Sequence, residues 1–107
     1  MKIIDILKNA KSVAIVGASN RIGRPGYILT KNLLDGGFKG EIYPVNPREE
    51  NVLGIKCYPN VSSLPRTPDI AVIAVTAQRV PTIIEECGKK GTKIAVIISA
   101  GFSETGR

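Results

Sequence analysis

The 107-residue sequence predicts an α/β fold, in which a parallel sheet lies between two layers of helices. Short β-branched runs at 12–16, 70–75 and 93–98 are apolar on both faces, which is typical of buried parallel strands. Segments with helical spacing alternate with these runs. The hydrophobic content of 43% and the charged content of 22% are those of a globular protein. The length allows a single domain, expected to span residues 1–107.

The first elements are a lead-in helix, a strand and a longer helix. Residues 3–9 place their apolar side chains on one side of a short helix. The strand at 12–16 then ends at Gly17, and a helix is predicted over residues 25–35. Pro25 suits the first turn of that helix. Its predicted buried face carries Leu29, Leu33 and Leu34.

The middle of the chain is predicted to form a second strand and two small elements. The second strand covers residues 42–45, and Pro44 places it at a sheet edge or ends it there, because proline cannot donate to a ladder. Residues 52–58 are expected to add a short extra strand. Residues 61–64 are expected to form one helical turn.

The last elements are the strand at 70–75, a helix at 79–90 and a strand at 93–98. Three side chains of the helix, Ile83, Ile84 and Cys87, are spaced to face the sheet. Residues 99–107 are expected to form a loop that another helix would normally follow. We therefore expect the sheet to be truncated at its C-terminus.

This β-α-β-(β)-β-α-β order, with right-handed crossovers, predicts a Rossmann-like, doubly wound, three-layer α/β/α sheet. Ligands bind such sheets at the carboxyl ends of the strands, where the strand order reverses. Those ends are residues 17–23, 46–48, 75–80 and 99–102.

The composition excludes several chemistries. The sequence has no histidine, which removes the usual zinc sites, a Ser-His-Asp triad and a Cys-His pair. Two cysteines do not make a disulfide framework, so we expect a cytoplasmic protein. No apolar run approaches the roughly 20 residues that span a bilayer, so we expect no membrane partner.

The net charge of +6 is spread evenly along the chain, without a basic tail. We therefore expect no nucleic-acid partner. The excess suits a small phosphorylated ligand, and it equally suits a surface that is merely solubilised by charge.

The first loop has the chemistry of a phosphate site. Backbone N–H groups at a strand-to-helix junction converge, and the helix dipole adds positive potential. Ser19 and Asn20 supply hydrogen-bonding groups, and Arg21 and Arg24 supply charge. The glycines at 17, 23 and 26 depart from the G-x-G-x-x-G pattern, so a turn that merely needs glycine is the alternative interpretation.

The second loop bears on which nucleotide would bind. Nicotinamide dinucleotide sites carry an acid at this strand end, whereas this chain has Val45-Asn46-Pro47-Arg48 before Glu49. A guanidinium there attracts a phosphate on the ribose. Coenzyme A and NADP both carry one, so both stay open. Alternatively, Arg48 is a solvated charge paired with Glu49 or Glu50.

The remaining loops are less specific. Residues 75–81 offer small and apolar side chains at a strand end and then a helix start, which suits an adenine face or a pantetheine arm. Residues 99–102 are small enough for a thin chain to pass. Taken alone, each of these two loops is better explained as a packing feature than as a ligand contact.

Several motifs in order resemble one family: Gly17-Ala18-Ser19, Gly23-x-x-Gly26, Gly37-Phe38-Lys39-Gly40, Tyr43-Pro44-Val45-Asn46-Pro47, Asp69-Ile70-Ala71-Val72 and Ser99-Ala100-Gly101-Phe102-Ser103-Glu104-Thr105-Gly106. From residue 10 onward, the chain looks like the N-terminal CoA-binding domain of the NDP-forming acyl-CoA synthetases. The motifs are closest to the ADP-forming acetate–CoA ligases.

The resemblance implies coenzyme A as the cofactor and assigns four groups of residues to it. The loop for the diphosphate contains Gly17, Ala18, Ser19, Asn20, Arg21, Ile22 and Gly23. The segment for the adenosine and its 3′-phosphate contains Val45, Asn46, Pro47 and Arg48. Residues along the nucleotide and pantetheine are Val75, Thr76 and Ala77. The loop near the thiol contains Ala100, Gly101 and Phe102.

The resemblance also implies a function without catalytic residues in this chain. The domain would bind CoA or acyl-CoA and position the thiol for acyl transfer from an acyl phosphate formed elsewhere. Its partners would be further ligase domains, including one with a catalytic histidine, or an ATP-grasp subunit. A stand-alone CoA-binding protein is the alternative, and an NADP-binding domain is a third interpretation.

Overall fold

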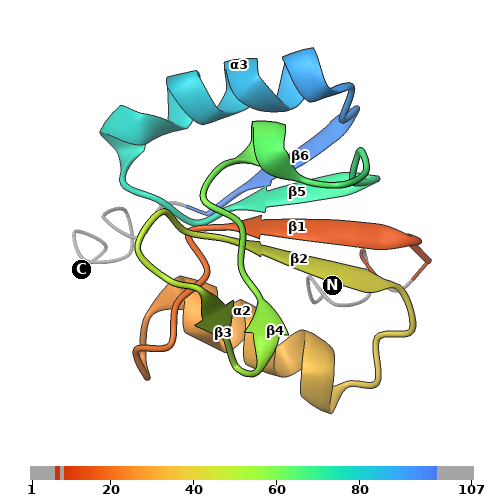
Figure 1. The fold of residues 1–107 in the computed structure, drawn as a ribbon, viewed down its shortest axis with the longest axis vertical. Coiled ribbons are helices and arrows are strands. Elements are labelled where there is room, and N and C mark those ends of the chain that lie inside the picture. The colour runs from red at the N-terminus through yellow and green to blue at the C-terminus, as the bar shows by residue number, and fades with distance from the viewer. Residues whose placement is uncertain (1–6, 8, 99–107) are drawn as a thin grey trace.

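A four-stranded parallel sheet forms the centre of the protein, in a computed structural model that describes residue 7 and residues 9–98 (Figure 1). Its spatial order is β2-β1-β5-β6. The strands are β1 (Ser12–Val16), β2 (Glu41–Val45), β5 (Ile70–Ile73) and β6 (Ile94–Ile97). Helices α2 (Pro25–Asp35) and α3 (Val80–Lys90) cover opposite faces of the sheet (Figure 1). The predicted α/β class and Rossmann-like layering are confirmed.

Strand β1 is buried along its whole length, which its apolar sequence predicts. Alternate residues point to opposite faces. Val13 and Ile15 belong to a core cluster with Leu29 and Leu33 of α2. The other face of the sheet packs in a second cluster that includes Ile83 and Cys87 of α3. Each helix therefore covers its own hydrophobic core.

Strand β2 lies at the edge of the sheet, which is one of the two alternatives that Pro44 predicts, and it continues to Val45 rather than ending at the proline. β2 pairs with β1 on one side, where Pro44 stands opposite Ile15. On the other side, the Pro44 carbonyl accepts a hydrogen bond from the Tyr58 N–H at 2.9 Å. The nitrogen of a strand residue points to the same side as its carbonyl, so the missing N–H of Pro44 removes no bond to β1.

Four apolar side chains are more exposed than expected. Helix α2 has its predicted bounds, but Leu34 is 41% exposed, and Ile84 of α3 is 37% exposed. β6 was expected to be buried, yet Ile94 and Ile97 are each 51% exposed. The physical reason is that β6 is the other edge strand, paired within the described residues only with β5.

Residues 52–58 form a hairpin arm rather than the single strand that was expected. β3 (Asn51–Val52) pairs antiparallel with β4 (Ile55–Lys56). The turn between them has positive φ at Leu53 (51°) and Gly54 (83°), as two-residue hairpin turns require. After it, the helical turn expected near residues 61–64 is present as η1 (Val61–Ser63). The side chain of Asn60 caps η1 by accepting from the Ser63 N–H at 2.9 Å.

Two expectations fall mainly outside the described residues: the lead-in helix at 3–9, of which residues 7 and 9 are described, and the loop at 99–107. Leu7 is described and is buried in the core on the α2 side. Within the described part of the chain, no helix is long and apolar enough to cross a membrane.

Candidate functional site

The first loop brings the end of β1 against both β5 and α2. Gly17 has a φ of 95°, and a Cβ placed on it would lie 2.2 Å from the Ala74 carbonyl oxygen. A Cβ on Gly26, in the first turn of α2, would lie 1.9 Å from the Gly17 carbonyl oxygen. Only glycine permits this close approach at either position. The approach brings the positive end of the α2 dipole close to the carboxyl end of the central strand.

A cleft of about 920 Å³ opens at this end of the sheet, between the loops that follow β1, β2 and β5. This volume lies within the range of ligand sites. The cleft brings together nine residues predicted from the sequence: Gly17, Ser19, Arg21, Val45, Asn46, Pro47, Arg48, Val75 and Thr76. Three segments that are far apart in the sequence therefore meet at one site, as the predicted topology requires.

The other predicted residues lie elsewhere. Ala18 is fully buried behind the loop, and Ile22 is 84% exposed. Asn20, Gly23 and Ala77 are exposed and do not line the cleft. Ala100, Gly101 and Phe102 lie outside the described residues.

Four guanidinium groups make the cleft electropositive. Arg21 and Arg24 come from the first loop, Arg48 from the second and Arg79 from the turn before α3. In the described part of the chain, the ion pairs are Lys31–Asp35 and Lys89–Glu85, so the predicted alternative in which Arg48 pairs with an adjacent glutamate is wrong. Unpaired guanidinium groups are suited to phosphate.

Several residues that line the cleft were not predicted as site residues. The start of α2 adds Pro25, the turn η2 (Ala77–Arg79) adds Gln78, and the start of α3 adds Thr82 and Ile83. The topology contained a signal for these, because η2 and α3 follow the carboxyl end of β5. Pro59 and Asn60 also line the cleft. They do so because the Asn46 N–H donates to the Tyr58 carbonyl at 2.9 Å, a contact that no sequence pattern indicates.

Asn46 joins the first two loops. Its Nδ2 donates to the Ala18 carbonyl oxygen at 2.8 Å, and its Oδ1 accepts from the Arg48 N–H at 2.8 Å. The second bond fixes the backbone that carries the Arg48 side chain. Asn46 therefore sets the relative position of two walls of the cleft.

Asn20 joins the first loop to the β3–β4 hairpin. Its Nδ2 donates to Glu49 Oε1 at 3.1 Å and to the Asn51 carbonyl at 2.7 Å. Its Oδ1 accepts from the Leu53 N–H at 2.9 Å. Both amide protons are therefore already used within the protein.

The two cysteines belong to the core. Cys57 and Cys87 are buried, and burial raises the pKa of each thiol. A raised pKa reduces the thiolate fraction, so neither residue has the character of a nucleophile.

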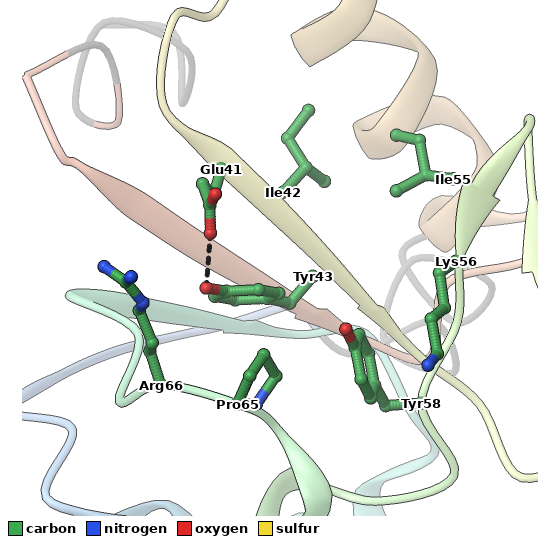
Figure 2. A pocket seen from close by; sticks show the side chains of 8 residues that line it. All are labelled: Glu41, Ile42, Tyr43, Ile55, Lys56, Tyr58, Pro65 and Arg66. Atoms are coloured by element: carbon green, nitrogen blue, oxygen red, sulfur yellow. Dashed lines mark hydrogen bonds between the residues drawn. The ribbon is translucent and has the colours of Figure 1, made fainter.

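A second cavity of about 450 Å³ lies beside the outer edge of β2 (Figure 2). The rings of Tyr43 and Tyr58 meet edge to face there, with centroids 6.1 Å apart. Figure 2 shows the Tyr43 hydroxyl pointing to Glu41, to which it donates a hydrogen bond. None of the site residues predicted from the sequence lines this cavity. It is separate from the cleft at the carboxyl ends of β1, β2 and β5.

Comparison with known proteins defines the family. The family described as "CoA binding domain" matches residues 11–105. The chain is 51% identical over 96 residues to acetate–CoA ligase [ADP-forming] II of Archaeoglobus fulgidus, covering 90% of this chain and 14% of that protein. It is 55% identical to acetate–CoA ligase [ADP-forming] of Methanocaldococcus jannaschii, covering 90% of this chain and 13% of that protein.

Solved structures show the same relationship. A dinucleotide forming acetyl-coenzyme A synthetase 1 from Ca. Korarchaeum cryptofilum, in complex with phosphate and ADP, matches with a TM-score of 0.85 and 45% identity. The match covers 96% of this chain and 22% of that one. A conserved hypothetical protein from Pyrococcus furiosus matches with a TM-score of 0.76 and 34% identity, over 82% of this chain and 74% of that one.

The fold and the cleft together define a Rossmann-like α/β domain with a cationic site at its strand ends. Within that class, the chain belongs to the CoA-binding domain family. The predicted resemblance to the ADP-forming acetate–CoA ligases is confirmed, as is coenzyme A as the cofactor of the family. The chain spans about 14% of the length of the curated relative from Archaeoglobus.

Proposed function

We propose that this chain binds coenzyme A as the CoA-binding module of an ADP-forming acyl-CoA synthetase. One observation carries the proposal: four arginines surround the cleft at the strand ends in a member of this family. Coenzyme A carries a diphosphate and a ribose 3′-phosphate, and guanidinium groups hold phosphates with bidentate, charge-assisted hydrogen bonds. The donor set of the cleft therefore fits the cofactor.

Each wall has a proposed role in holding the cofactor. Ser19 and Arg21, beside the start of α2, would hold the diphosphate, and Arg48 would hold the 3′-phosphate. Val75 and Thr76 offer a small surface to the adenosine or the pantetheine arm. The predicted roles of Ala100, Gly101 and Phe102 near the thiol remain part of this proposal.

The complete activity would require other parts of a larger enzyme. The sequence has no histidine to carry a phosphoryl group. One relative is named as the alpha subunit of acetate–CoA ligase [ADP-forming] I of Pyrococcus furiosus. We propose that this module, taken as residues 1–107, positions the thiol toward an acyl phosphate formed in further domains or with an ATP-grasp subunit. The proposed location is the cytoplasm.

A stand-alone CoA-binding protein is the second candidate. The match to the Pyrococcus furiosus protein favours it, because this chain covers 74% of that structure rather than a small part. The two candidates share the same binding site and differ in whether further domains act on the bound cofactor.

Calorimetric titration tests the shared binding site. We expect coenzyme A to bind more tightly than dephospho-CoA, NADPH or ADP, because it alone among these ligands offers both a diphosphate and a ribose 3′-phosphate. A preference for NADPH over coenzyme A would contradict both candidates. Co-purification with an ATP-grasp polypeptide, followed by assay of acyl-CoA formation, distinguishes the ligase module from the stand-alone protein.

Arg48→Ala tests the assignment of the 3′-phosphate. The substitution is expected to weaken coenzyme A by about 1–3 kcal/mol and dephospho-CoA much less, because only coenzyme A has the phosphate that Arg48 would hold. Titration of both ligands measures the difference. Arg66→Ala is a matched control, because Arg66 is exposed and does not line the cleft. Equal weakening of both ligands by Arg48→Ala would show that this residue does not contact the 3′-phosphate.

A further inference from the structure

Glu49 is an acidic side chain in a cleft that is otherwise suited to phosphate. It lines the cleft beside Arg48, and it is partly buried. The other acid that lines the cleft, Glu86, has a structural role, because its Oε2 accepts from both the N–H and the hydroxyl of Ser62 at 3.0 Å. Glu49 accepts one side-chain hydrogen bond rather than two, and its donor is the Asn20 amide. A carboxylate here reduces the attraction of the cleft for phosphate. Its position in the cleft is explained if it recognises another part of the ligand.

Glu49 is held in place without being neutralised. Its Oε1 accepts from Asn20 Nδ2 at 3.1 Å, and the structure gives its Oε2 no hydrogen-bond donor among the described residues. Although four arginines share the cleft, none of them lies within ion-pair distance of Glu49 in the described part of the chain. The Asn20 amide is neutral, so it orients the carboxylate and leaves its charge intact. One oxygen therefore stays available as a hydrogen-bond acceptor.

We propose that Glu49, positioned by Asn20, determines at which ribose hydroxyl a bound ligand carries its phosphate. This inference rests on the proposed binding of coenzyme A. Coenzyme A has a free 2′-hydroxyl next to its 3′-phosphate, and that hydroxyl can donate to Oε2 while Arg48 holds the phosphate. A ligand phosphorylated at the 2′ position places negative charge against the carboxylate and is repelled.

The test compares coenzyme A with its isomer that carries the phosphate at the 2′ position. The wild-type protein is expected to prefer coenzyme A. Glu49→Gln should reduce this preference by about tenfold, because an amide can donate to the 2′-phosphate that the carboxylate repels. Glu50→Gln is the matched control, since Glu50 is adjacent and exposed and does not line the cleft. An unchanged preference in Glu49→Gln would overturn the inference.

The outcome for the wild-type protein separates this inference from the proposed function. If the wild-type protein fails to bind coenzyme A, the proposed function fails. If it binds coenzyme A and does not discriminate between the isomers, only the role of Glu49 fails. A melting curve for each variant identifies loss of folding, and Glu49→Ala provides a second variant in which the charge is absent.

Asn20 is a positioning residue in this proposal, and a double-mutant cycle tests it. Asn20→Ala is expected to reduce the preference for coenzyme A over its isomer, because the carboxylate is no longer held. In the Glu49→Gln background, the same change should leave the preference unaltered. A merely structural role for Asn20 predicts equal weakening of both isomers in both backgrounds, and that result would overturn the positioning role.

Discussion

The side-chain amide of Asn46 donates to the carbonyl oxygen of Ala18 at 2.8 Å, across 28 residues of sequence. The same side chain accepts from the Arg48 N–H, so a single residue links the buried part of the first loop to the cationic part of the second. Parallel strands bring their carboxyl ends together, but the strands alone do not fix how the loops stand against each other. Asn46 supplies that constraint.

Asn46→Ala is therefore expected to affect both stability and binding. Loss of the two hydrogen bonds, with the carbonyl of the buried Ala18 left unpaired, should lower the free energy of unfolding by about 1–3 kcal/mol. Urea unfolding measures this loss, and titration with coenzyme A should show weaker binding. Asn32→Ala is the matched control, because Asn32 is exposed on α2 and its side chain makes no hydrogen bond among the described residues. Equal stability of the two variants would contradict the linking role of Asn46.

Two glycine-to-alanine substitutions are expected to change stability in opposite directions. At Gly26 the added Cβ would meet the Gly17 carbonyl oxygen at 1.9 Å, and backbone cannot move aside without separating α2 from β1. Gly26→Ala should destabilise the protein by several kcal/mol and impair binding in the cleft. At Gly88, in α3, the added Cβ meets nothing within 4 Å.

Gly88→Ala should raise the free energy of unfolding by about 0.5–1 kcal/mol, because alanine loses less backbone entropy in a helix. Thermal or urea unfolding of both variants gives the comparison. A Gly26→Ala protein as stable as the wild type would show that the close contact between α2 and the first loop is not maintained in solution.

The Tyr43 phenol is expected to make stability fall at high pH. Burial, assisted by the hydrogen bond to Glu41, raises the pKa of Tyr43 from 10.0 to about 12. Between these values the folded protein keeps a proton that the unfolded chain has lost. The contribution is therefore fully present below pH 10 and is lost as the pH rises to about 12.

Urea unfolding across this pH range tests the contribution of Tyr43. The fall in stability should be smaller in Tyr43→Phe, which has no phenol to ionise. Tyr27→Phe, which changes a tyrosine outside this contact, is expected to retain the wild-type slope. If Tyr43→Phe also keeps that slope, the phenol is not the group responsible.

The sequence predicts the central part of the fold well, for reasons visible in particular residues. The run from Ser12 to Val16 is apolar on both faces, which only a central parallel strand can bury. Pro44 predicts an edge or a strand end because it lacks a donor, and β2 is at an edge. These predictions depend on the residues themselves or on their neighbours, so a single sequence contains the necessary information.

Predictions fail where exposure depends on distant elements. The strand from Ile94 to Ile97 has the apolar composition of a buried strand, and only the sheet order shows that β6 is at an edge. The turn at Leu53 and Gly54 lacks the Asn-Gly signal of a two-residue hairpin, so the β3–β4 pairing was not anticipated. In both cases tertiary contacts decide the outcome.

The candidate site likewise has a part that the sequence predicts and a part that depends on tertiary contacts. Nine predicted residues line the cleft because strand ends and loops can be located from the pattern of apolar runs. The orientation of Asn20 could not be predicted, since its partners belong to a hairpin that begins 31 residues later in the chain. From its chemical type alone, Asn20 resembles a residue that donates hydrogen bonds to phosphate. In the fold its amide protons bond to Glu49 and to the Asn51 carbonyl instead.

The close approach of Gly17 to Ala74 also has a kinetic meaning. This contact joins two segments, the ends of β1 and β5, that meet only after the chain has closed its long parallel crossovers, and such closures are slow steps in folding. An intact cleft is therefore a property of the fully folded chain and is absent from partly folded forms. A ligand present at 100 times its dissociation constant would add about 2.7 kcal/mol against global unfolding. The rate at which binding capacity returns during refolding would then report the last step of sheet assembly.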